Sequence, residues 1–300
     1  MANKEVLAVD LGQSGSRFRQ GQVSVSSERG KLAGENTLPA LRAVFESTQK
    51  FSADIVALSC TGFYGVVSEP EKYLQLCQEF FGAKEVAVID DGLAGYFGAV
   101  GNNDGVVLSI GSGTVAIAGR RGSYSHADGI GHIFGDLGGG FWLGKAALER
   151  VLATLEGRDD ATFLTEFFES EIKTYESLKS HTDAKAHLLC INAAKTLLEA
   201  AETKNTDAIT IRDKGAEYLA KTIRAAWTNV GGMRNEGISI ALLGKLAENK
   251  GYAESIRRRT SSLLPQITLI EPQGNHLDGA IFIAEHVPED IEPLLRWWHK

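Results

Sequence analysis

The sequence predicts an α/β fold of two lobes with a cleft between them, and three observations lead to this expectation. A chain of 300 residues can bury a large core and usually divides into two domains. Residues 6–25 and 105–120 share one pattern, in which a glycine-rich turn joins two runs and predicts a β-hairpin. The segment between these hairpins alternates helical and strand-like periodicity.

The remaining elements follow from apolar spacing along the chain. Between the hairpins, residues 39–50 and 71–81 have helical spacing, whereas 55–59 and 86–89 are short apolar strands. After the second hairpin, an apolar period of about 3.6 residues predicts a helix-rich insertion. Its helices are expected over 141–155, 163–178, 187–201 and 209–230, before a strand at 238–243 returns to the sheet.

The boundary between the lobes is expected near the second hairpin, because the chain has no linker rich in Pro, Gly and Ser. We predict an N-terminal lobe over residues 1–112 and a C-terminal lobe over 113–285. A final helix over 286–300 is expected to pack on the first lobe.

Composition and charge exclude several classes of protein. A net charge of −7 and a pI near 5.6 argue against nucleic acid as a partner. The run Arg257 to Arg259 is interpreted as the solvated face of a helix. Cys60, Cys77 and Cys190 have no metal-site spacing and are interpreted as small buried residues. No signal peptide or membrane-spanning run is evident, so the cytoplasm is the predicted location.

The turn of the first hairpin can hold phosphate. Its small residues let backbone amides approach an anion, and Asp10 can hold Mg²⁺ through water. Taken alone, the pattern is more typical of an ordinary tight turn, and its repetition later in the chain favours a phosphate site. The predicted nucleotide-binding residues here are Asp10, Gly12, Gln13, Ser14, Gly15 and Ser16.

A turn of the same construction follows in the second hairpin. It contains Gly111, Ser112, Gly113 and Thr114. Two such turns facing each other across a cleft would grip a nucleotide triphosphate from both sides. Neither turn is a P-loop, because no Gly-Lys-Ser/Thr follows.

Two adjacent aspartates follow the strand at 86–89. Asp90 and Asp91 precede a predicted helix, at the strand end where α/β folds place ligands. Capping of that helix is the alternative role for either carboxylate, and two aspartates allow both roles. Phosphoryl transfer to an alcohol needs a carboxylate beside the hydroxyl, so Asp91 is the predicted catalytic base.

Residues 129–142 contain six glycines and one carboxylate before a helix. This glycine density favours a loop that approaches a polyhydroxylated ligand closely, and Gly131 is a predicted contact. A long turn with a capping aspartate is the alternative. His132 is interpreted as a structural histidine, and the Trp297-Trp298 pair as packing.

In order and spacing, these motifs resemble the BadF/BadG-type ATPases, and among them the N-acetylglucosamine and glucosamine kinases of the actin, Hsp70 and hexokinase superfamily. The resemblance covers most of the chain and implies an actin-like ATPase (ribonuclease H-like) fold. It also implies ATP and Mg²⁺ as cofactors, Asp91 as catalytic aspartate, and Asn36 and Asp136 as sugar contacts. Leu242 to Lys245 resembles the adenosine motif, so Gly244 and Lys245 are added to the nucleotide site.

The sequence departs from the family pattern at two positions. Leu137 stands where the sugar loop usually has glutamate, which leaves the sugar open. Lys245 replaces the usual second glycine of the adenosine motif, which leaves the phosphoryl donor open. The iron-sulfur cysteines of the activase branch are missing, which argues against that branch.

The leading hypothesis is an ATP-dependent kinase of an amino sugar or related hexose, with the 6-hydroxyl as the acceptor that the resemblance implies. The alternative is a non-catalytic nucleotide or sugar sensor of the same fold. A sensor needs no base beside an acceptor hydroxyl, so Asp10 and Asp91 favour the kinase. An actin-like filament protein is a third hypothesis, and the sequence leaves open whether the protein is a homodimer.

Overall fold

Each of the two units of the computed structural model is built around one mixed sheet, and residues 4–13, 15–32, 34–178 and 184–300 are described. The first unit is Met1–Val107 with Glu271–Lys300, and the second is Leu108–Ile270. These limits differ from the predicted lobes. Residues 271–285 were predicted to lie in the second lobe, but the chain returns to the first unit at Glu271.

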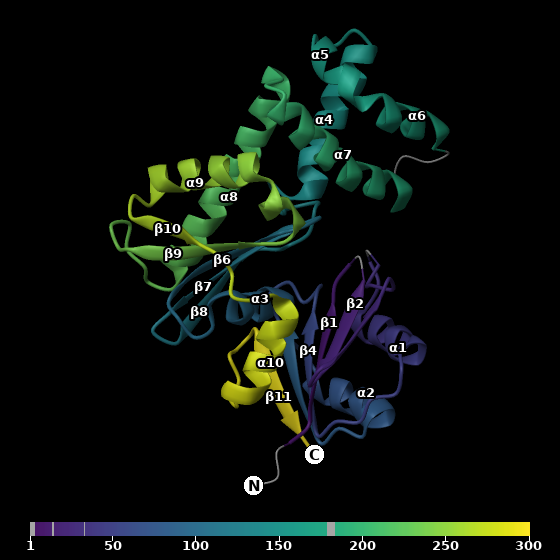
Figure 1. Cartoon of the computed structure of the whole chain (residues 1–300), viewed down its shortest axis with the longest axis vertical. Helices are drawn as coiled ribbons and strands as arrows, with labels where there is room; N and C mark the ends of the chain where they lie inside the picture. Colours follow the sequence, from purple (N-terminus) through teal and green to yellow (C-terminus); the bar gives the residue numbers. More distant parts are fainter. Residues whose placement is uncertain (1–3, 14, 33, 179–183) are drawn as a thin grey trace. The chain divides into compact units, whose positions relative to one another are not determined.

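The sheet of the first unit has the order β11-β5-β4-β1-β2-β3 (Figure 1). Its three parallel strands are β1 (Val6–Leu11), β4 (Ile55–Cys60) and β5 (Glu85–Asp90). They are almost wholly buried, as expected for strands covered on both faces. The second run of the predicted hairpin over 6–25 is not one strand but two antiparallel strands, β2 (Ser16–Gln20) and β3 (Val23–Ser27), joined by a turn.

Two pairs of helices cover this sheet. On one face, α1 (Thr37–Ser47) and α2 (Pro70–Phe81) pack on Leu7 and Val9 of β1. The other face carries α3 (Asp91–Val100) and α10 (His276–His286) (Figure 1). These two helices cross closely, because a Cβ on Gly279 would contact the Ala94 carbonyl.

The prediction of a helix over 286–300 is wrong. Residues Leu295–His299 form strand β11, which pairs antiparallel with β5 at the edge of the sheet. Alternation explains the difference: Leu295 and Trp297 are buried, whereas Trp298 is 43% exposed. A period of two is that of a strand, not of a helix.

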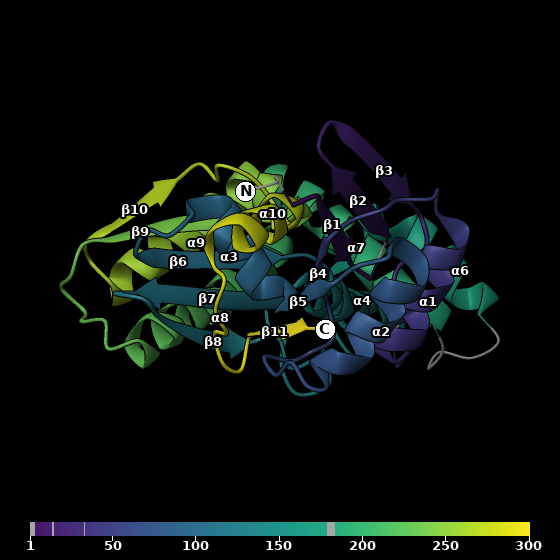
Figure 2. The same ribbon diagram turned by 90° about the horizontal axis from the view of Figure 1, so that it is seen from below.

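The second unit has a five-stranded sheet of order β10-β9-β6-β7-β8 (Figure 2). The predicted hairpin is formed by β6 (Gly105–Ile110) and β7 (Thr114–Arg120), and the predicted strand at 238–243 is β9 (Ile238–Leu243). Two strands were not predicted, β8 (Ser123–Asp128) and β10 (Ile267–Ile270). Both lie at sheet edges and are largely part-exposed, which weakens the apolar signal.

The predicted helix-rich insertion is present in the second unit. Its long helices are α4 (Gly140–Leu155), α7 (Ala184–Glu202), α8 (Thr206–Asn229) and α9 (Lys250–Leu263). The predicted helix at 163–178 is broken into α5 (Thr162–Thr165), η1 (Glu166–Phe168) and α6 (Glu169–Ser177), and η2 (Lys245–Glu248) follows β9. Within the described ranges, every helix is too short or too polar to cross a membrane.

Candidate functional site

The carboxyl ends of β1, β4 and β5 bring two predicted site residues and one further polar residue to one edge of the first sheet. Asp10 lies near the end of β1, Thr61 follows β4, and Asp91 follows β5. The strands are parallel and adjacent, with β4 in the middle. This edge is where open α/β sheets bind ligands.

Asp10 is held on both carboxylate oxygens. Its Oδ2 accepts hydrogen bonds from Arg17 Nε at 3.1 Å and Nη2 at 2.5 Å, and its Oδ1 accepts one from Ser59 Oγ at 3.0 Å. Strand register explains the contacts, since Arg17 on β2 and Ser59 on β4 lie opposite Asp10. Asp10 is therefore a buried, fixed carboxylate, 7% exposed.

This arrangement fits a water-mediated role toward Mg²⁺. A carboxylate has about four acceptor positions, and Arg17 and Ser59 use three of them, leaving one on Oδ1 for a metal-bound water. No cluster of three or more His, Cys, Asp or Glu able to hold a metal occurs among the described residues. Mg²⁺ commonly keeps several waters and relies on substrate phosphates, which such a site allows.

The first turn is closed by backbone bonds. Gly12 N donates to Gly15 O at 2.9 Å, and Lys31 N donates to Gly12 O at 2.9 Å. Gly30 packs directly on the turn, because a Cβ there would lie 2.5 Å from Gly12 O. The predicted contact Ser16 is 1% exposed and its hydroxyl has no hydrogen-bond partner among the described residues. Ser14, which is also predicted to bind the nucleotide, lies outside the described residues.

The adjacent aspartates have different surroundings. Asp90 is 1% exposed and caps α3, accepting hydrogen bonds from Gly92 N at 3.0 Å and Gly65 N at 3.1 Å. Asp91 is the first residue of α3, is partly exposed, and hydrogen-bonds to the Thr61 side chain. The capping role therefore belongs to Asp90, which leaves the Asp91 carboxylate facing the strand ends.

Burial raises the pKa of Asp91 to about 7, and the neighbouring Asp90 and Asp10 charges act in the same direction. His276, at the start of α10, and the Thr61 hydrogen bond oppose this rise in pKa. A carboxyl group that titrates near neutral pH can accept a proton from an alcohol more readily than an ordinary aspartate.

Asn36 precedes α1 as its N-cap residue but makes no side-chain capping hydrogen bond. Asparagine at this position usually caps the helix. The Asn36 side chain is exposed, so its amide is available to a ligand.

In the second unit, the turn after β6 is joined to the start of α4. Gly111 N donates to Gly113 O at 2.9 Å, which closes the turn. The first amides of α4 reach it as well, with Gly140 N donating to Gly111 O at 2.8 Å and Phe141 N to Ser112 O at 2.9 Å. The N-terminus of α4 is thus hydrogen-bonded to the second predicted nucleotide turn.

Asp136 lies against the same turn. Its Oδ1 accepts a hydrogen bond from Thr114 N at 3.2 Å, and a Cβ on Gly113 would lie 2.5 Å from its Oδ2. Asp136 N in turn donates to Asp128 Oδ1 at 2.7 Å. Burial raises the pKa of Asp136. The structure therefore joins Asp136 to the predicted nucleotide turn, a contact that the sequence did not predict.

Close packing explains much of the glycine density at 129–142. A Cβ on Gly139 would lie 2.9 Å from the Gly113 carbonyl carbon, and one on Gly140 would lie 3.0 Å from Gly111 O. Gly131 has a positive φ of 88°, and its carbonyl accepts from Gly135 N at 2.8 Å. Several of these glycines are thus required by the fold, whatever the loop binds.

The adenosine-like motif adjoins the second turn. Gly244 has a φ of 92°, and its Cα faces the backbone of Ile110, the residue before Gly111. Lys245 starts η2 and is exposed. The structure thus gathers the turn, Asp136, Gly244 and Lys245 within the second unit.

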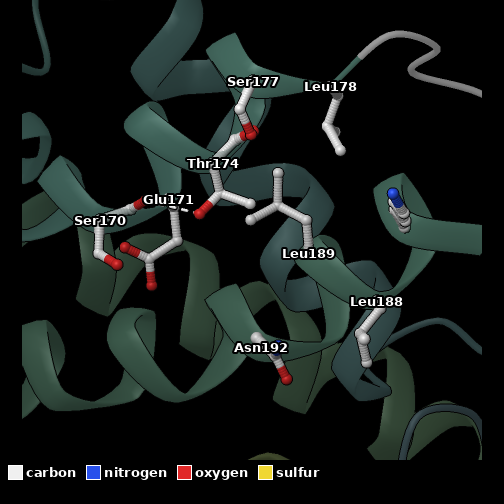
Figure 3. A pocket seen from close by; sticks show the side chains of 9 residues that line it. Ser170, Glu171, Thr174, Ser177, Leu178, Leu188, Leu189 and Asn192 are labelled. Atoms are coloured by element: carbon white, nitrogen blue, oxygen red, sulfur yellow. Dashed lines mark hydrogen bonds between the residues drawn. The ribbon is translucent and has the colours of Figure 1, made fainter.

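A pocket of about 590 Å³ lies elsewhere, between α6 and α7 (Figure 3). Ser170, Glu171 and Thr174 of α6 face Leu189 and Asn192 of α7 across it. Residues predicted from the sequence to bind ligand do not line it in the described part of the chain.

Sequence reasoning missed four residues of the first unit: Arg17, Ser59, Thr61 and Lys31. Arg17 and Ser59 become partners of Asp10 through strand register, which spans unrelated parts of the sequence. Thr61 could have been found, because it follows a predicted strand directly, as Asp91 does.

The chain resembles several known proteins. It is 23% identical over 211 residues to an N-acetylmuramic acid/N-acetylglucosamine kinase from Clostridium acetobutylicum, covering 67% of each chain. A proposed N-acetylglucosamine kinase from Chromobacterium violaceum superposes with a TM-score of 0.67 at 20% identity, over 93% of this chain and 98% of that one. A ROK family glucokinase from Streptomyces griseus, in complex with glucose and AMPPNP, superposes with a TM-score of 0.58 at 15% identity, over 94% of this chain and 98% of that one.

These solved structures are sugar kinases of the actin-like ATPase fold, which confirms the predicted fold class. The family model for the BadF/BadG/BcrA/BcrD ATPases matches residues 2–284, most of the chain. The chain therefore belongs to the BadF/BadG/BcrA/BcrD ATPase family.

Proposed function

We propose that this protein is an ATP-dependent sugar kinase with Asp91 as its catalytic base. The observation that carries the proposal is the Asp91 carboxylate, which lies at a strand end, hydrogen-bonds to Thr61, and has a pKa raised by burial to about 7. Asp90 performs the structural capping, so a second carboxylate beside it calls for another role.

In the proposed reaction, the acceptor hydroxyl oxygen of the sugar attacks the terminal phosphorus of ATP. The bond from that phosphorus to the bridging oxygen breaks, ADP leaves, and the hydroxyl proton passes to Asp91. Mg²⁺, when bound, neutralises charge on the phosphates. Asp10, fixed by Arg17 and Ser59, would orient a water of the metal.

The proposed acceptor is an amino sugar, N-acetylglucosamine or glucosamine, or a related hexose, at the 6-hydroxyl. The names of the Clostridium and Streptomyces relatives support this class of substrate. The free amide of Asn36 supports a hydroxyl contact in the first unit. Gly131 and Asp136 remain proposed contacts of the sugar in the second.

The experiment that tests the class of activity is ADP release from MgATP over a panel of hexoses, amino sugars and N-acetylated sugars. A kinase shows sugar-dependent ADP release with at least one member of the panel. Binding of nucleotide or sugar without any release would instead favour a sensor.

The test of the base compares two adjacent substitutions. Positioned base catalysis contributes about 10² to 10⁴-fold, so we expect Asp91→Asn to lower kcat by that factor while ATP affinity stays nearly unchanged. Asp90→Asn is the matched control and should lower kcat much less, because asparagine caps helices about as well as aspartate. It removes one of the two acceptor oxygens, on which Gly92 N and Gly65 N depend, so it should mainly lower stability. A near-normal kcat in Asp91→Asn would contradict the proposed base.

A further inference from the structure

Lys31 is a buried lysine beside the first phosphate turn. It lies in the segment between β3 and α1, and its backbone N donates to Gly12 O at 2.9 Å. The residue is only 8% exposed. Lysine is almost never buried to this extent unless it is paired.

Its side chain runs to the strand ends. A Cβ on Gly62 would contact Lys31 Nζ and would lie 2.8 Å from Cε, so the glycine leaves the space that the lysine fills. Gly62 follows Thr61 at the end of β4, which lies between the strands that carry Asp10 and Asp91. The pKa of the buried Cys60 thiol, raised mainly by burial, is raised further by Asp10 and Asp91 and lowered by Lys31, so these groups are neighbours.

The Lys31 ammonium has no hydrogen bond or ion pair with any residue that the structure describes. The nearby Glu35 carboxylate is bound by Arg29 and by Leu32 N, the latter at 2.9 Å. Asp10 is bound by Arg17 and Ser59. Negative charges lie near Lys31, since the pKa of Glu35, lowered mainly by its hydrogen bond with Arg29, is lowered further by Lys31, but none of these carboxylates forms an ion pair with Lys31 among the described residues. A buried ammonium without a direct hydrogen-bonding partner is costly, and a bound anion would relieve that cost.

We propose that the Lys31 ammonium binds an oxyanion of the ligand at this sheet edge. The anionic oxygens available are those of the terminal phosphoryl group of the nucleotide or of a carboxylate on the sugar. Position favours the phosphoryl group, because Lys31 is tied to the phosphate turn through Gly12. The identity of the ligand rests on the proposed function, whereas the unpaired ammonium does not.

The first arm of the test is calorimetry with AMPPNP and with ADP, each with Mg²⁺. Hydrogen bonds to charged groups are strong enough that Lys31→Met should reduce the preference for the triphosphate by about 10- to 100-fold, with little change for ADP. Lys50→Met is the matched control, an exposed lysine of the same unit. It should keep the preference of the wild type.

The second arm separates binding from folding. Methionine fills similar space without a charge, so the ligand-free Lys31→Met protein should have a Tm equal to or above that of the wild type. A structural role for Lys31 would lower the Tm. A lower Tm with an unchanged preference for the triphosphate and an unchanged KM for the acidic sugar would overturn the inference.

The third arm compares N-acetylmuramic acid, which carries a carboxylate, with neutral N-acetylglucosamine. If the carboxylate is the partner, Lys31→Met raises the KM of the acidic sugar alone and leaves the nucleotide preference intact. If wild-type protein binds nucleotide and sugar but Lys31→Met changes neither preference, this inference fails by itself. If the wild type binds neither nucleotide nor acidic sugar, the inference fails together with the proposed function.

Discussion

Asp90 and Asp91 are chemically identical neighbours that the backbone assigns to different tasks. The extended backbone of Asp90 turns its carboxylate onto the amides of Gly92 and Gly65, which stabilise the turn from strand to helix. Asp91, one residue later, contacts Thr61 and shares a neighbourhood with Asp10. The difference arises because the backbone is extended at Asp90 and helical from Asp91 onward.

The raised pKa of Asp91 predicts a pH dependence. A base acts only as its carboxylate, so kcat/KM should fall as the pH decreases through about 7, approaching tenfold for each further pH unit. Initial rates of ADP release across this range, at sugar concentrations below KM, measure the effect. The residual activity of Asp91→Asn should lack this acidic limb, and a limb that persists there belongs to another group.

The Asp10 site predicts a change in magnesium requirement. Asp10→Asn keeps the shape and the Ser59 partner but removes the charge that pairs with Arg17. We expect the Mg²⁺ concentration for half-maximal rate to rise by about tenfold or more, because residues that hydrogen-bond to the ligands of a metal typically change its affinity to that extent. Asp159→Asn, which breaks an ion pair with Arg150 in the second unit, is the control and should leave the magnesium dependence unchanged.

At the scale of elements, the second turn, residues 135–140 and the start of α4 form one tightly packed group. Asp136 supports Thr114 from one side, and Gly139 and Gly140 lie on the turn from the other. A movement of any of these elements is therefore transmitted to the backbone that is proposed to hold phosphate.

This packing predicts that a single methyl group disturbs nucleotide binding. In Gly139→Ala, the φ of −70° suits alanine, but the new Cβ meets the Gly113 carbonyl carbon at 2.9 Å. Overpacking of this kind costs about 1–3 kcal/mol, so ATP affinity by calorimetry should fall, with a lower urea midpoint. Gly237→Ala is the control, since nothing lies within 4 Å of its Cβ. Equal ATP affinity in the two variants would show that the contact does not govern the turn.

The spacing of apolar residues along the sequence was sufficient to predict several strands and helices. The strands at 55–59, 86–89 and 238–243 and the helix at 71–81 appear close to their predicted bounds. The edge strands β8, β10 and β11 were missed because their partners are distant in sequence or their faces are half exposed. In the site, the partners of Asp10 depend on strand register, and the position of the Lys31 side chain depends on its packing against Gly62. Neither leaves a periodic signal in the sequence.

On the scale of the whole molecule, the first unit is made from two distant parts of the chain. Residues 271–300 add α10 to one face of the first sheet and β11 to its edge. Arg19 on β2 forms an ion pair with Asp278 on α10. The lateral edge of β5, the strand that precedes Asp91, is thus covered by a strand about 200 positions later in the sequence.

Removal of that strand should expose the edge of β5. A chain ending after Pro293 loses the pairing of Leu295–His299 and the buried Leu295 and Trp297 side chains. We expect a lower urea midpoint and concentration-dependent aggregation, because an uncovered strand edge invites pairing with other chains. Light scattering measures the aggregation. Trp298→Ala, at a position 43% exposed, is the control, and aggregation equal to that of the truncated chain would contradict this account.

Because the chain returns to the first unit only at Glu271, the second unit is synthesised in full before the first is complete. Residues 108–270 are contiguous, so the second unit can complete its sheet while still attached to the ribosome. The first unit has β1 to β5 available early but must wait for α10 and β11, so its sheet lacks the edge strand and one covering helix while more than half of the chain is translated. During that interval the edge of β5 lacks its neighbouring strand, and slower translation of residues 108–270 would lengthen the time in which other chains can pair with it.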